Sequence, residues 1–139
     1  MVHWENFVAA QQPDLSYGLE LGSRHGGLSY FFAKKYGAQV CCSDYGFPSE
    51  KAKQLHELAG LTELISYHDV NATQIPFADE TFDFVVFKSM LGAVGARGHF
   101  ARIEETLNEI HRVLKPGGVL FFAENLRGSW LHQKSRAFF

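Results

Sequence analysis

The sequence has 139 residues, of which 46% are hydrophobic and 20% charged; these proportions are typical of one globular domain over residues 1–139 and exclude a disordered or low-complexity chain. Thirteen lysines and arginines oppose fifteen aspartates and glutamates, so we expect neither nucleic acid nor an anionic membrane as a partner. The apolar runs are far shorter than the roughly 20 residues that a membrane span needs, and the first residues lack a secretory signal pattern. We therefore expect a cytoplasmic protein.

Cysteine and histidine give no sign of a metal site. The only two cysteines, Cys41 and Cys42, are adjacent within an apolar run, which suits neither a disulfide framework nor spaced metal ligands. The histidines are scattered, without the His-Glu-x-x-His spacing of zinc sites. We expect two reduced, buried thiols and no bound metal.

Short apolar runs alternate with segments of helical period, and this alternation predicts an α/β fold with a parallel sheet. Residues 4–10 are a candidate short helix. The predicted strands cover residues 17–21, 39–43, 64–68, 82–87 and 119–124. Three predicted helices lie between them, with apolar stripes of Leu28, Phe31, Phe32 and Tyr36, of Ala52, Leu55, Leu58 and Ala59, and of Ile103, Leu107, Ile110 and Leu114. Residues 115–118 end the last helix, and the glycines within residues 92–98 indicate a loop.

The most informative segment is the turn after the first predicted strand. Residues 17–29 read Tyr-Gly-Leu-Glu-Leu-Gly-Ser-Arg-His-Gly-Gly-Leu-Ser, so a strand runs into three glycines and then into a helix. Glycines there let the backbone approach a ligand, and the N–H groups of the helix start favour an anionic group. The phosphate-binding G-x-x-x-x-G-K-[ST] pattern is absent, and the dinucleotide pattern fails at Arg24. The segment therefore predicts either a ligand site or a tight packing turn.

Two carboxylates stand near this turn. Glu20 lies two residues before Gly22, and Asp44 ends the second predicted strand. In a doubly wound sheet an acidic residue at that second position reaches the ribose hydroxyls of an adenosine-type ligand, so we expect Glu20 and Asp44 to face one crevice. The alternative is a strand-end charge and a turn-forming aspartate. Tyr45 suits either an adenine face or the core.

Several segments together resemble the class I S-adenosylmethionine-dependent methyltransferases, in particular their small-molecule branch, over about residues 15–128. In that family an acidic-x-Gly-x-Gly-x-Gly loop cradles the methionine end of the cofactor, and residues 20–26 here read Glu-Leu-Gly-Ser-Arg-His-Gly. The family's ribose-binding acid matches Asp44, and its adenine-binding pair matches Asp69 and Val70. Residues 75–86 and 109–118 are similar to the segments before the family's fourth and fifth strands.

The resemblance implies a Rossmann-like doubly wound sheet, mostly parallel, with strand order 3-2-1-4-5 and a crevice between the first and fourth strands. It implies S-adenosylmethionine as the cofactor and an unidentified small or medium-sized methyl acceptor. The cofactor-binding residues that it predicts are Glu20, Gly22, Ser23, Arg24, Gly26, Asp44, Tyr45, Asp69, Val70 and Lys88. No catalytic residue is assigned, because the sulfonium methyl group is already activated. Candidates for substrate contact near strand ends are His25, Lys88, Glu124 and Asn125.

The sequence departs from the family pattern in two places. Arg24 stands where the family has its middle glycine, and we expect its guanidinium to pair with the cofactor's carboxylate. The family's usual last two strands are missing, so we expect a chain truncated at its C-terminus. Without them the fifth strand is an apolar edge, which predicts either a homodimer through that strand or another cover.

Two other functions are compatible with the same fold. One is a non-catalytic module that binds S-adenosylmethionine or S-adenosylhomocysteine, or an inactive truncated core. The other is a nicotinamide-dependent oxidoreductase, which would need small residues where Arg24 and His25 stand. No motif names the acceptor or its reacting atom.

Overall fold

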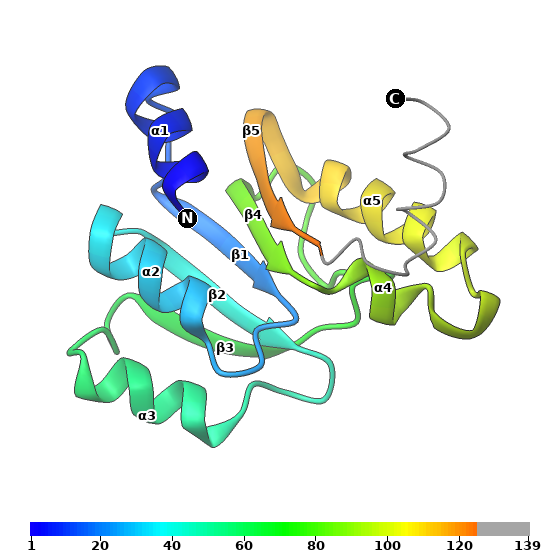
Figure 1. The fold of residues 1–139 in the computed structure, drawn as a ribbon, viewed down its shortest axis with the longest axis horizontal. Helices are drawn as coiled ribbons and strands as arrows, with labels where there is room; N and C mark the ends of the chain where they lie inside the picture. Colours follow the sequence, from blue (N-terminus) through cyan, green and yellow to red (C-terminus); the bar gives the residue numbers. More distant parts are fainter. Residues whose placement is uncertain (125–139) are drawn as a thin grey trace.

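The computed structural model describes residues 1–124. Five strands within them form one parallel sheet. Its strand order is β3-β2-β1-β4-β5 (Figure 1). Successive strands are added on one side of β1 as far as β3 and then on its other side from β4, so the order of the strands reverses between β1 and β4. The strands are β1 (Tyr17–Leu21), β2 (Gln39–Asp44), β3 (Ile65–Asp69), β4 (Phe82–Lys88) and β5 (Leu114–Ala123). The predicted α/β class and strand order are confirmed.

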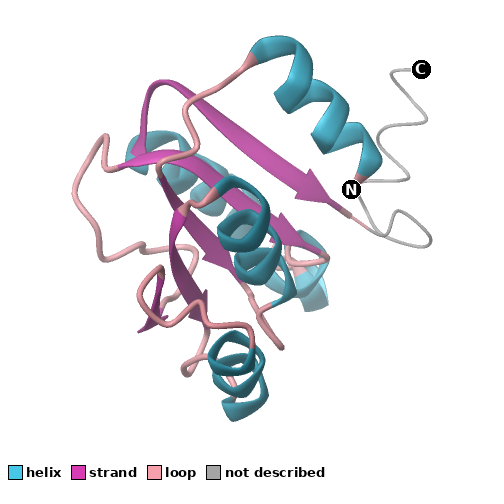
Figure 2. Ribbon diagram, turned by 90° about the vertical axis from the view of Figure 1, so that its left-hand side faces the viewer, coloured by secondary structure: helices cyan, strands magenta, loops and turns pink. Residues whose placement is uncertain are grey.

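Helices cover both faces of the sheet (Figure 2). They are α1 (Val2–Gln11), α2 (Gly27–Tyr36), α3 (Glu50–Leu58), α4 (Leu91–Val94) and α5 (Ala101–Val113), with a short 3-10 helix η1 (Ala96–Gly98) before α5. On one face Trp4 of α1 and Phe32 of α2 pack against Phe121 of β5. On the other face Ile103 and Ile110 of α5 belong to a separate core cluster. None of the helices in residues 1–124 has both the length and the apolar character to cross a membrane.

The prediction that Leu55 and Leu58 form the buried face of the helix α3 is wrong. Leu58 is 89% exposed and Leu55 is 37% exposed, whereas Ala52 and His56 are fully buried. A spacing of four residues puts Ala52 and His56 on the same helix face. Burial of the imidazole is possible because both ring nitrogens find hydrogen-bond partners on distant segments, as described below.

The strand β5 begins at Leu114, earlier than predicted. Leu114 pairs with Phe82 and Val119 pairs with Phe84, with a register shift between the two pairs. Residues 115–118, which were expected to form a turn, therefore bulge out within the strand. The bulge is anchored by Lys115, whose Nζ lies 3.0 Å from the Asp83 carboxylate.

The glycine-containing segment expected to be a loop instead holds the short helix α4. One carboxylate oxygen of Glu124 accepts the N–H groups of Met90 at 2.7 Å and of Leu91 at 2.8 Å, which satisfies donors that a helix start leaves unpaired. Leu91 is buried. Glu124 is therefore a capping residue, and Asn125 lies outside the described residues.

Two segments that resemble the methyltransferase pattern meet through Arg112 of α5. Its guanidinium donates to the carbonyls of Ile75 and Phe77, each at 2.8 Å, and to the Asp79 carboxylate at 2.8 Å. Glu109 completes the cluster by accepting the Ile75 N–H at 2.7 Å, and its hydrogen bonds with Arg112 lower the pKa of this carboxyl. The loop into β4 is thus fixed to the helix that precedes β5.

Candidate functional site

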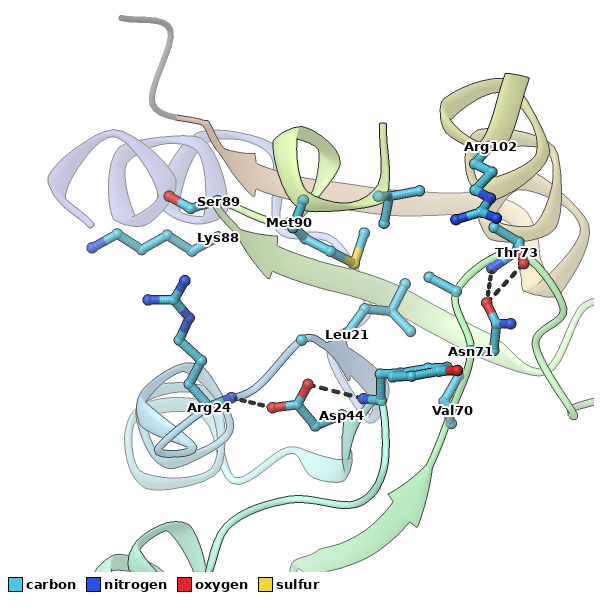
Figure 3. Close-up of a pocket in the computed structure, with 15 residues that line it drawn as sticks. Leu21, Arg24, Asp44, Val70, Asn71, Thr73, Lys88, Ser89, Met90 and Arg102 are labelled. Carbon is cyan, nitrogen blue, oxygen red and sulfur yellow. Dashed lines mark hydrogen bonds between the residues drawn. The ribbon is translucent and has the colours of Figure 1, made fainter. Parts of the chain in front are cut away.

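A cavity of about 570 Å³ opens at the carboxyl ends of β1, β2 and β4, where the sheet topology reverses (Figure 3). Parallel α/β sheets bind their ligands at this position. We call it the first cavity. Its lining is Leu21, Gly22, Arg24, Asp44, Tyr45, Val70, Asn71, Ala72, Thr73, Lys88, Ser89, Met90, Ala93, Val94 and Arg102.

The loop between β1 and α2 has an unusual backbone. Gly22, Arg24 and Gly26 all have positive φ, at 63°, 48° and 71°. Arg24 is not a glycine, so its left-handed conformation costs roughly 1 kcal/mol or more. This explains physically why a glycine suits that position of the family pattern, and it shows that Arg24 is held there by its surroundings.

Asp44 supplies part of that restraint. One carboxylate oxygen accepts the Arg24 N–H at 2.8 Å, and the other accepts the Tyr45 N–H at 2.9 Å (Figure 3). Each oxygen keeps a further lone pair that can face the cavity. The Tyr45 side chain is 80% exposed, so the core alternative for Tyr45 is wrong.

Glu20 lies beneath the loop and not in the first cavity. It is 2% exposed, and the Ser29 N–H, at 2.8 Å, and the Ser29 hydroxyl both donate to one of its carboxylate oxygens. Burial raises the pKa of Glu20 to about 7, although these hydrogen bonds oppose the rise. The expectation that Glu20 and Asp44 face one crevice is wrong, because neighbouring strand residues point to opposite faces and Glu20 points away from Leu19 and Leu21.

Two other predicted residues, Gly26 and Asp69, also do not line the first cavity. Asp69 accepts the Gly46 N–H at 2.8 Å and so holds the turn after β2. Gly26 precedes α2, and a Cβ atom there would lie 2.6 Å from Cε1 of His56. Both residues shape the site from outside it.

His56 is a supporting residue that the sequence did not reveal. Its Nε2 lies 2.8 Å from the carbonyl oxygen of Gly26, and its Nδ1 lies 2.8 Å from the Tyr67 hydroxyl. Because a carbonyl only accepts, Nε2 carries the proton and Nδ1 accepts from Tyr67. Burial lowers the pKa of His56. Only the spacing from Ala52 could have indicated this role.

Two residues that line the first cavity, Asn71 and Arg102, were not predicted from the sequence. Asn71 follows Val70, and its side-chain oxygen accepts both the N–H of Thr73, at 3.0 Å, and the Thr73 hydroxyl, at 2.7 Å (Figure 3). An asparagine directly after the predicted Asp69 and Val70 pair was a usable turn signal. Arg102 comes from the polar face of α5, where the sequence carries no signal.

A second cavity, of about 760 Å³, adjoins the first and shares Gly22, Arg24, Lys88 and Ser89 with it. Of these, Ser89 has a left-handed backbone like that of Arg24, with φ at 53°. Strained backbone of this kind is concentrated at functional sites. The rest of the lining is Met1, His3, Trp4, Glu20, Ser23, His25, Gly27, Leu28, Phe122 and Ala123.

Cysteine and metal chemistry contribute nothing visible at either cavity. Cys41 and Cys42 are free and buried, as predicted. Within residues 1–124 there is no group of three or more histidine, cysteine, aspartate or glutamate side chains that could hold a metal ion.

Several curated proteins with similar sequences are named as methyltransferases. The chain is 29% identical over 116 residues to a sarcosine/dimethylglycine N-methyltransferase of Halorhodospira halochloris, covering 83% of this chain and 39% of that protein. It is 37% identical over 137 residues to a ubiquinone/menaquinone biosynthesis C-methyltransferase of Bartonella tribocorum, covering 92% of this chain and 50% of that protein. The chain therefore spans half or less of the length of these relatives.

A solved structure supports the fold. The SAM-dependent methyltransferase of Aquifex aeolicus matches with a TM-score of 0.60 and 20% identity, over 81% of this chain and 59% of that one. The family model described as "Methyltransferase domain" matches residues 19–122. Family membership implies S-adenosylmethionine as the cofactor. Together with the order of the strands and the cavity at the reversal point, this family match shows that the chain belongs to the class I S-adenosylmethionine-dependent methyltransferases.

Proposed function

We propose that this protein binds S-adenosylmethionine in the first cavity and transfers its methyl group to a small or medium-sized acceptor. The observation that carries the proposal is the placement of Asp44. Its carboxylate ends β2 at the rim of a cavity located at the sheet's reversal point, and it also fixes the loop at Arg24. An acid in this position suits the two hydroxyls of a ribose.

The lining fits the remaining parts of an adenosyl cofactor. Val70 and Tyr45 offer an apolar and an aromatic surface for the adenine. Gly22 and Lys88 border the methionine end. Ser23 lines the second cavity and not the first.

Arg24 is the residue proposed to bind the cofactor's carboxylate. Its guanidinium makes no hydrogen bond or ion pair with the residues that the structure describes, and it points into the cavity region (Figure 3). A guanidinium pairs with a carboxylate through two parallel hydrogen bonds. Glu20, Gly26 and Asp69 would act indirectly, by holding the loops that carry these groups.

When bound, the cofactor supplies a methyl group that is already activated by its positively charged sulfur. The chain's own contribution is then to bind and orient both molecules, because alignment alone lowers the barrier substantially. No residue is assigned as a catalytic base. Relatives named as N-methyltransferases and as C-methyltransferases both match, so their names do not fix the acceptor atom.

Calorimetric titration with S-adenosylhomocysteine tests the proposal. We expect binding that Asp44→Ala weakens roughly tenfold or more, whereas Glu63→Ala, which changes an exposed carboxylate, leaves it unchanged. Thermal melting of each variant checks that it is folded. A folded chain that binds NAD but not S-adenosylhomocysteine would refute the proposal. Binding without methyl transfer from a radiolabelled donor would instead indicate a non-catalytic binding module.

We also propose a homodimer formed through β5. This strand is the edge of the described sheet, a feature that favours association. Light scattering at increasing concentration tests it, and a monomer throughout would contradict it. The free thiols of Cys41 and Cys42 suit the reducing cytoplasm proposed as its location.

A further inference from the structure

The second cavity adjoins the proposed cofactor site across a shared wall, and this inference depends on that proposed function. The wall consists of Gly22, Arg24, Lys88 and Ser89. A molecule in the second cavity would therefore sit next to the methionine end of a cofactor in the first. This is where an acceptor must lie for in-line transfer.

The charge of the second cavity is one-sided. The cationic head groups of Lys88 and Arg24 lie on the same side of the first cavity (Figure 3), and both residues also line the second cavity. The Lys88 ammonium makes no ion pair with the residues that the structure describes. The one carboxylate in the lining is Glu20. That group is buried, accepts from Ser29, and makes no ion pair with Lys88 or Arg24, so both cations remain available to a ligand.

The remaining surface is largely apolar. Trp4, Leu28 and Phe122 come from α1, α2 and β5 and line the cavity together. The Trp4 ring is fixed by its packing on Phe121, with ring centroids 5.7 Å apart, so the apolar wall is preformed. A wall of this kind takes an apolar body, and a few polar groups then orient it.

From these features we infer that the second cavity is the acceptor site and that it takes a small organic carboxylate with an aromatic or branched apolar body. Lys88 binds the carboxylate, and Trp4, Leu28 and Phe122 contact the body. Of the lysine and arginine side chains in the wall, Lys88 is the one left for the acceptor, because Arg24 is used by the cofactor's own carboxylate. A singly charged carboxylate matches the charge of Lys88 better than a doubly charged phosphate does.

Calorimetry with three probes in the presence of S-adenosylhomocysteine tests the inference. Phenylacetate carries both features, phenylacetamide lacks the charge, and acetate lacks the ring. We expect phenylacetate to bind roughly tenfold tighter than either of the others. Lys88→Gln should remove that advantage over phenylacetamide, whereas Lys34→Gln, at an exposed lysine of α2, should not. Phe122→Ala should weaken both aromatic probes equally.

The outcomes separate the two proposals. Failure of the folded chain to bind S-adenosylhomocysteine refutes the proposed function itself. Normal S-adenosylhomocysteine binding with equal affinity for phenylacetate and phenylacetamide overturns only the acceptor inference. A Lys88→Gln variant that loses affinity for S-adenosylhomocysteine but keeps the preference for phenylacetate also overturns it, because Lys88 would then serve the cofactor.

Discussion

Replacing Glu20 by glutamine should change how the stability of the protein depends on pH. Burial raises the pKa of this carboxyl from 4.5 to about 7 in the folded chain, so the folded state binds the proton more tightly than the unfolded state does. Its contribution is most favourable below pH 4.5 and is lost as the pH rises through 7. Since a tenfold change in proton affinity corresponds to about 1.4 kcal/mol, the loss is about 3 kcal/mol.

Urea unfolding of the parent and of Glu20→Gln at about pH 5 and about pH 8 measures this effect. The glutamine carbonyl still accepts from Ser29, and any difference in packing is the same at every pH. The stability of the variant relative to the parent should therefore increase by about 2.5 kcal/mol over the interval. An equal pH dependence in the two proteins would refute the argument, because Glu20 would then have an ordinary pKa in the fold.

Three further substitutions test the geometry around the site. Arg24→Gly relieves a left-handed backbone but removes the guanidinium, so the melting temperature should not fall while affinity for S-adenosylhomocysteine drops roughly tenfold; unchanged affinity in calorimetry contradicts the proposed pairing. Gly26→Ala, at a φ of 71° and with a Cβ atom 2.6 Å from the His56 ring and 2.9 Å from Cβ of Ala52, should cost about 2 to 4 kcal/mol in urea unfolding. Adding His56→Ala should relieve the contact with the ring but not the one with Ala52, so the two effects should be non-additive. Arg112→Lys loses the fork that binds two carbonyls and two carboxylates and should cost about 1 to 3 kcal/mol; a loss below about 0.5 kcal/mol would show that the cluster is not stabilising.

Four of the five strands were predictable to within one residue at each end, because each is a short apolar run with a clear boundary, whereas β5 begins at Leu114, five residues before its predicted start. β1 matches its predicted bounds, and β2 and β4 each run one residue further, to Asp44 and Lys88. The helix α4 was not predictable, because its start is satisfied by Glu124, more than thirty residues away in sequence. The clearest local signal in this segment is its glycines, which disfavour a helix.

The candidate site was predictable where it depends on strand ends. Asp44 and Lys88 end parallel strands and Val70 follows one. The carboxyl ends of these strands meet at one edge of the sheet, and all three residues line the first cavity. Glu20 was misplaced because the motif gives its position in the chain and not the face of β1 to which it points. His56 was missed for a related reason: periodicity follows apolar residues, whereas this imidazole is buried through partners on other segments.

Burial shifts the pKa values of His56 and Glu20 in opposite directions, and both side chains support the loop between β1 and α2. The lowered pKa of His56 means that its contribution is present above pH 6.5 and is lost as the pH falls below that value, whereas the contribution of Glu20 is lost as the pH rises. Between about pH 5 and pH 6.5 the two slopes oppose each other in the parent. Glu20→Gln should therefore reveal a stability that increases with pH, and His56→Gln one that decreases. If the slopes have the same sign, the burial of one of these groups is not what sets its proton affinity.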